Sequence, residues 1–145
     1  MKQKEASVIT GGQHIDERGK LLYFNDFDMK PVRRFYIIEH TETKIVRAWQ
    51  AHQKEQKWLH VIKGSFKIVV VKPDDWEMPS QKLFTKVIIL KSDSNQLLHI
   101  PGGYANGFKA LEVNSKLMVF SDFSIANAGE DDFRFDKDLW YDWYK

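Results

Sequence analysis

Short segments of alternating apolar and polar residues, each closed by a turn sequence, run through almost all of this chain. Side chains of a β-strand point alternately to its two faces, so the pattern predicts strands rather than helices. The expected strands are residues 7–10, 20–24, 34–40, 45–51, 58–62, 65–71, 83–90, 96–100, 105–111 and 115–122. About ten short strands with almost no helical periodicity predict an all-β sandwich or a double-sheet jelly roll.

Two stretches depart from the alternation. Prolines cannot donate to a sheet ladder, so residues 73–79, which begin and end with proline, are expected to form an exposed excursion. Near the C-terminus, Asp131 or Asp132 is a candidate cap for a short helical turn. The aromatic residues behind it have the spacing of one helix face: Trp140, Trp143 and Tyr144. We expect this aromatic tail to pack as a flap over an edge of the barrel.

The composition indicates one soluble domain spanning residues 1–145. Hydrophobic residues make up 43% of the chain and aromatic residues 14%, which is unlike a disordered chain. The 22 basic and 20 acidic residues are interspersed, so no basic stripe indicates a nucleic-acid partner. The absence of cysteine excludes disulfides, thiolate catalysis and cysteine-based zinc sites. Without a signal-like N-terminus or a run of about 18 apolar residues, a cytoplasmic protein with no membrane partner is expected.

The stretch RAWQAHQKEQKWLHVIKG, residues 47–64, holds the candidates for chemistry. Gln50 and His52 are two residues apart, so they share one face of a strand. Only one of them is a histidine, and glutamine, histidine and asparagine beside a lysine ammonium make a poor transition-metal cage. We therefore expect no metal and no other cofactor.

The same residues fit acid–base chemistry better. The imidazole of His52 titrates near neutrality and can move a proton to or from a carbon beside a carbonyl. Lys57 can stabilise a developing enolate or a phosphate. Arg18 and Arg47 suit bidentate capture of phosphate or carboxylate. The residues alone leave open that His52 is only a surface or hydrogen-bonded core residue.

Several motifs in order resemble the RmlC-like cupins, which are the dTDP-4-dehydrorhamnose 3,5-epimerases and the dTDP-sugar 3,4-ketoisomerases. The similar stretches are RAWQAHQKEQKWLHVIKGS, LLHIPGGYANGF, DERGKL, DDFRFD and VRRFYII, which together span about residues 14–136. The resemblance implies a double-stranded β-helix, the cupin jelly roll, that commonly dimerises. It also implies metal-free proton abstraction beside a sugar ketone, with arginines and aromatic residues holding a nucleotide diphosphate.

The resemblance assigns proton-transfer roles residue by residue. The epimerases' base histidine falls on Gln50, which cannot act as a base, and the ketoisomerases' second histidine falls on His52. The epimerase lysine is retained as Lys57. The usual histidine of the IPGGYANGF stretch is Asn106, and the epimerases' acid tyrosine aligns with Phe123, which has no proton to donate.

We therefore expect a nucleotide-sugar epimerase or ketoisomerase with His52 as base and Lys57 beside it. The expected substrate-binding residues are Arg18, Arg47, Gln50, Asn106 and Phe123. One alternative is a cupin that binds a nucleotide sugar or other carbohydrate without catalysis. Another is a structural protein whose barrel is filled by Trp49 and Trp58. A homodimer is expected in each case, because barrel edge strands favour pairing.

Overall fold

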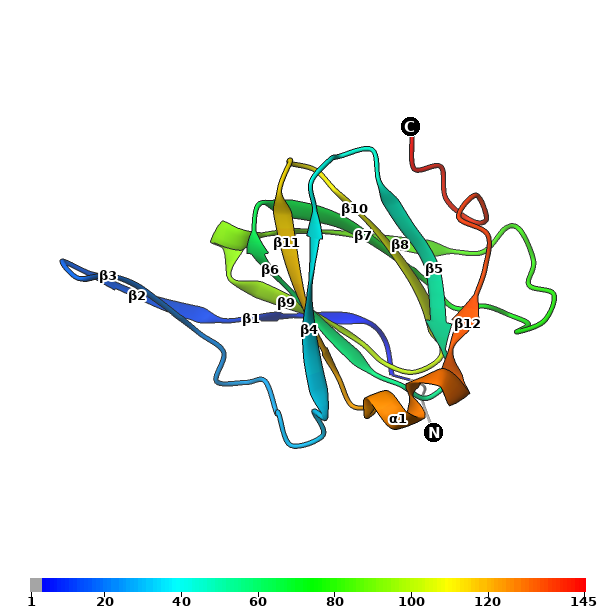
Figure 1. The fold of residues 1–145 in the computed structure, drawn as a ribbon, viewed down its shortest axis with the longest axis horizontal. Helices are drawn as coiled ribbons and strands as arrows, with labels where there is room; N and C mark the ends of the chain where they lie inside the picture. Colours follow the sequence, from blue (N-terminus) through cyan, green and yellow to red (C-terminus); the bar gives the residue numbers. More distant parts are fainter. Residues whose placement is uncertain (1–3) are drawn as a thin grey trace.

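The computed structural model describes residues 4–145, which form two five-stranded antiparallel sheets and a separate hairpin. The first sheet has the order β1-β9-β6-β11-β4, and the second has the order β12-β5-β10-β7-β8. Figure 1 shows the sheets facing each other, with the hairpin of β2 and β3 projecting to one side. This arrangement is the jelly roll that the sequence predicts.

The strands are short, as the turn sequences require. They are β1 (Ser7–Thr10), β2 (Gly12–Asp16), β3 (Gly19–Tyr23), β4 (Arg34–His40), β5 (Val46–His52), β6 (Lys57–Lys63), β7 (Ser65–Val71), β8 (Thr85–Lys91), β9 (Gln96–Ile100), β10 (Tyr104–Ala110), β11 (Ser115–Ser121) and β12 (Phe133–Arg134). The helical segments are η1 (Ser92–Ser94), α1 (Ile125–Ala128) and η2 (Gly129–Asp131). Four predicted strands, β1, β4, β7 and β9, have the expected bounds, and six others differ by at most two residues. The sequence prediction missed two strands: β12, which has only two residues, and β2, whose glycine and aspartate ends match turn chemistry.

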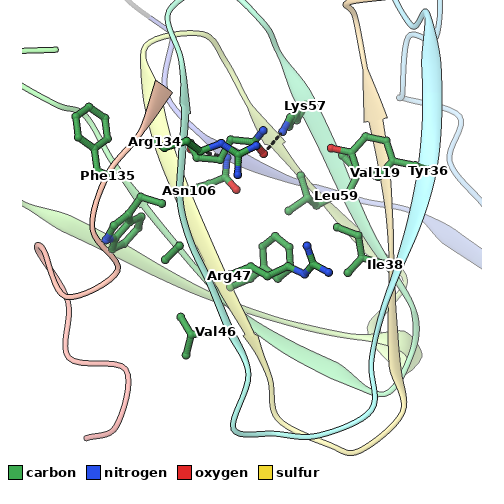
Figure 2. A pocket seen from close by; sticks show the side chains of 14 residues that line it. Tyr36, Ile38, Val46, Arg47, Lys57, Leu59, Asn106, Val119, Arg134 and Phe135 are labelled. Atoms are coloured by element: carbon green, nitrogen blue, oxygen red, sulfur yellow. Dashed lines mark hydrogen bonds between the residues drawn. The ribbon is translucent and has the colours of Figure 1, made fainter. Parts of the chain in front are cut away.

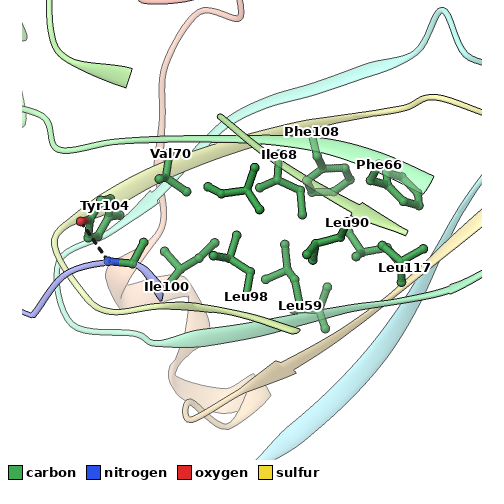
Figure 3. Packing of buried hydrophobic residues seen from close by; sticks show 14 of the residues in the cluster. Leu59, Phe66, Ile68, Val70, Leu90, Leu98, Ile100, Tyr104, Phe108 and Leu117 are labelled. Atoms are coloured by element: carbon green, nitrogen blue, oxygen red, sulfur yellow. Dashed lines mark hydrogen bonds between the residues drawn. The ribbon is translucent and has the colours of Figure 1, made fainter. Parts of the chain in front are cut away.

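The hydrophobic core lies between the two sheets (Figure 3). Its side chains come from the inward positions of the alternating strands, and the most buried include Leu59, Phe66, Ile68, Leu98 and Leu117. Burial of each such side chain stabilises the fold by about 1.5–3 kcal/mol relative to exposure. The core therefore fixes which side chains of each strand face the space between the sheets.

A second cluster joins the C-terminal tail to the outer face of the second sheet. The indole of Trp49 donates to the carbonyl of Leu139 at 2.9 Å, and Trp143 is buried against Trp49 with ring centroids 5.5 Å apart. The aromatic tail therefore packs on the barrel as a flap, as predicted, but it covers the outer face of the second sheet rather than an edge. The predicted helical turn is wrong, because the helical segments end at Asp131 and the following residues pair with β5 as β12.

Candidate active site

A cavity of about 420 Å³ lies between the sheets. β4, β6 and β11 form one wall, and β5, β10 and β12 form the other (Figure 2). Its charged and amide side chains are Arg47, Gln50, Lys57, Asn106 and Arg134, and Tyr36 adds a phenol. The remaining lining is mostly apolar, as is usual for a small-molecule site.

The two tryptophans do not fill this cavity. Trp49 packs against the C-terminal tail, and Trp58 stacks on His99 with ring centroids 4.9 Å apart. The open volume contradicts the alternative of a barrel filled by tryptophans.

A break in strand register brings Arg47 and Gln50 to the same cavity. Residues three apart on a regular strand point to opposite faces. Here Asn106 pairs with Gln50 and Phe108 pairs with Arg47, so the two residues between these pairs on β5 oppose the single residue Gly107 on β10. Such a bulge re-aims side chains. It requires glycine at position 107, since a Cβ there would lie 2.7 Å from the side chain of Trp143.

Lys57 is the buried cation of the cavity. It is 4% exposed, and its Nζ donates a hydrogen bond of 2.8 Å to Oε1 of Gln50 (Figure 2). Burial lowers the pKa of Lys57 from 10.5 to about 8; Glu55 opposes this shift and Arg34 adds to it. Both the ammonium and the amine are therefore accessible near neutral pH.

A buried polar layer lies behind Lys57. The Asp131 carboxylate accepts backbone N–H groups of residues 53, 54 and 55 at 2.8 Å each. The side chain of Glu55 accepts from the hydroxyl of Ser121 at 2.8 Å. His52 shares the face of Gln50, as the alternation predicts, and its Nδ1 donates to the Asp131 carbonyl at 2.7 Å. Burial, and then the charge of Lys57, lower the pKa of His52.

The cavity brings four of the predicted site residues together and leaves three outside. Those that line it are Arg47, Gln50, Lys57 and Asn106. His52 lies behind Lys57 and does not line it. Arg18 is exposed on the projecting hairpin, where it pairs with Asp16 at 2.7 Å. Phe123 lies outside the barrel near α1, and its carbonyl accepts from Arg34 at 3.0 Å.

Among the lining residues that sequence reasoning missed, two carry polar groups for chemistry, Tyr36 and Arg134. The guanidinium of Arg34 lies 5.1 Å from the ring centroid of Tyr36, and burial raises the pKa of the phenol. Alternation along β4 was the available signal, since Tyr36 occupies an inward position. Arg134 pairs with Asp132 at 2.8 Å. It belongs to the DDFRFD stretch, for which the resemblance to the cupins indicates no site residue.

Within residues 4–145, no group of three histidine, cysteine or acidic side chains is placed to hold a metal ion. Over the same residues, no helix is long and apolar enough to cross a membrane.

The fold and its inter-sheet cavity define an RmlC-like cupin. A family model described as WxcM-like, C-terminal (FdtA) matches residues 4–138, and the chain belongs to this family. A search of curated proteins found no match.

Solved structures show the same fold. A 3,4-ketoisomerase from Helicobacter canadensis has a TM-score of 0.71 and 22% identity over 92% of each chain. A mutant of the 3,4-ketoisomerase QdtA from Thermoanaerobacterium thermosaccharolyticum, in complex with TDP-4-keto-6-deoxyglucose, has a TM-score of 0.71 and 22% identity over 92% of this chain and 90% of that one. The rmlC epimerase from Mycobacterium tuberculosis has a TM-score of 0.74 and 20% identity over 93% and 73%.

Proposed function

We propose that this protein is a sugar-nucleotide isomerase or epimerase, which moves a proton at the carbon beside a ketone. The observation that carries the proposal is Lys57, a buried lysine hydrogen-bonded to Gln50 inside an open cavity. The ketoisomerases and epimerases among the structural relatives support the reaction class. The proposed ligand is a nucleotide sugar, as in the QdtA complex with TDP-4-keto-6-deoxyglucose.

Some cavity residues are proposed to bind the ligand, and others are proposed to transfer protons. Arg47 and Arg134 supply positive charge for a diphosphate, which arginine can bind in bidentate fashion. Gln50 and Asn106 add polar contacts to the sugar. Lys57 takes or returns a proton, because a group that titrates near the working pH can serve both as acid and as base. The phenol of Tyr36 is the proposed second proton donor.

His52 keeps a proposed role through Lys57. Because its Nδ1 donates to the Asp131 carbonyl, its Nε2 is the nitrogen free to take a proton. Since His52 does not line the cavity, a proton leaving the ligand meets Lys57 first and can reach His52 second.

A second candidate function is a cupin that binds a nucleotide sugar without turning it over. Gln50 favours it, since an amide cannot replace a histidine base, and so does the distance of Phe123 from the cavity. The two functions differ in one observable, which is proton exchange with solvent.

The test is NMR of TDP-4-keto-6-deoxyglucose with the protein in D2O, alongside calorimetry of TDP binding. The isomerase predicts deuterium at the carbon beside the ketone, whereas a binding protein predicts TDP affinity without exchange. If neither binding nor exchange occurs, both functions are contradicted. Exchange that is equally fast without protein would also contradict the enzyme.

The proposal includes a homodimer in the cytoplasm. Phe35 and Ile37 expose 60% and 52% of their surface on the outer face of β4, an edge strand that a second copy can cover. Arg18 lies on the projecting hairpin (Figure 1) and does not line the cavity of its own chain, so we infer that it contacts the ligand in the cavity of a second copy. Light scattering should give twice the chain mass, and Phe35→Lys should give the monomer. A wild-type protein that stays monomeric at all concentrations would contradict the proposed homodimer.

A further inference from the structure

A buried histidine contacts the cavity arginine from outside the site described above. His40, at the end of β4, is 1% exposed, and its ring lies between Phe66 and Phe108 with centroid distances of 5.5 and 5.6 Å. Its Nε2 lies 3.2 Å from Nε of Arg47. Because a guanidinium nitrogen can only donate, Nε2 of His40 is the acceptor.

This geometry sets the protonation state of His40. An accepting Nε2 carries no proton, so the neutral ring is protonated on Nδ1. Burial, and then the charge of Arg47, lower the pKa of His40 and favour this neutral form. The rings of Phe66 and Phe108 pack on it, Ser115 of β11 pairs with it across the strands, and Arg47 is the charged group that shifts its pKa. Arg47 is therefore the charged group that responds when His40 titrates.

Arg47 keeps its other donors for a ligand. Figure 2 shows its guanidinium extending across the cavity toward Ile38. Only Nε is used by His40, and among residues 4–145 no carboxylate forms an ion pair with Arg47. The two terminal amino groups can therefore bind an anionic oxygen pair.

We propose that His40 is a positioning residue, which holds the Arg47 guanidinium ready for the phosphate of a ligand while its own ring is neutral. A free arginine loses side-chain freedom when it binds, and the His40 hydrogen bond removes part of that loss beforehand. When His40 takes a proton it can no longer accept from Arg47, and the two positive charges repel. Anion binding should then weaken at acidic pH. That the ligand carries a phosphate rests on the proposed function. That His40 positions Arg47 rests only on the hydrogen bond between them.

The binding test uses TDP as probe and the full chain in four forms: wild type, His40→Phe, Arg47→Met and the double variant. Phenylalanine keeps an aromatic ring in the core but removes the acceptor. We expect His40→Phe to raise the Kd for TDP about 3- to 10-fold, the effect of losing one pre-ordered side chain. In the Arg47→Met background the same change should have no further effect. An equal loss in both backgrounds would show that His40 acts only on general structure, which overturns the proposal.

Two further readouts complete the test. As pH falls through the lowered pKa of His40, the Kd of wild type for TDP should rise more than that of His40→Phe. Protonation of the TDP phosphate affects both proteins equally, so the difference between them reports His40. Side-chain ¹⁵N NMR should show Nε2 of His40 unprotonated at neutral pH and an Arg47 Nε–H signal whose solvent exchange speeds up in His40→Phe. If TDP does not bind at all, the proposal of a nucleotide ligand is contradicted, and the NMR measurement alone tests whether His40 positions Arg47. An Arg47 signal unchanged in His40→Phe would then contradict the positioning role.

Discussion

Replacing Lys57 by methionine should change how the stability of the protein depends on pH. Burial lowers the pKa of Lys57 from 10.5 to about 8 in the folded state. At about 1.4 kcal/mol for each pH unit, this corresponds to about 3 kcal/mol of preference for the neutral amine. Because the side chain is almost fully buried, little of this is screened by solvent.

The sign follows from proton binding. Between pH 8 and 10.5 the unfolded chain keeps a proton on Lys57 that the folded chain has released. The free energy of unfolding contributed by this group therefore rises with pH across that window and is lost as pH falls back through 8. Methionine has no such dependence. The variant also loses the hydrogen bond from Lys57 to Gln50. This loss lowers the free energy of unfolding of the variant at every pH at which the ammonium would donate.

The assay is urea unfolding of wild type and Lys57→Met at several pH values from 7 to 10.5. The stability of wild type relative to the variant should increase by about 3 kcal/mol over the window. Lys63→Met, at the exposed end of the same strand, is the matched control and should follow wild type in its pH dependence. Parallel curves for wild type and Lys57→Met would refute the reasoning.

Three other changes test the structure around the site. Asp131→Asn should lower the free energy of unfolding by about 1.5–3 kcal/mol in urea titrations, because the carboxylate accepts the N–H groups of residues 53–55. An unchanged urea midpoint would contradict a stabilising role for these three hydrogen bonds. Gly107→Ala should lower the melting temperature, since its Cβ would meet Ala48 and Trp143, at a cost of about 1–3 kcal/mol; wild-type stability would contradict the bulge geometry. Burial lowers the pKa of three histidines: His40, His52 and His99. Stability should therefore fall as pH drops below about 6.5, where the unfolded histidines take protons first, and no change between pH 7 and 5.5 would contradict their burial as neutral rings.

The strands could be predicted from sequence because their alternation is regular. β4 and β7 have the predicted bounds, and Gln50 shares a face with His52, as the spacing of two requires. The aromatic tail was also predictable as a covering flap. Its detailed path was not, because Asp131 binds backbone groups of another loop instead of capping a helix.

The composition of the cavity was less predictable, because it depends on contacts between distant segments. Regular alternation separates Arg47 from Gln50, and only the bulge opposite Gly107 brings them together. The role of His40 has no signal in the sequence, since nothing there places its ring beside Arg47. His52 was predicted on the correct face, but the turn at Gly129–Asp131 that covers it could not be foreseen.

The most direct measurement is the rate of deuterium incorporation into TDP-4-keto-6-deoxyglucose by wild type, Lys57→Met and His52→Asn in D2O. Removing a general acid or base costs about 10²- to 10⁴-fold in rate. We predict a loss of this size for Lys57→Met with TDP binding retained, and a smaller loss for His52→Asn. Exchange that persists in Lys57→Met but disappears in His52→Asn would contradict the assignment of proton transfer to Lys57.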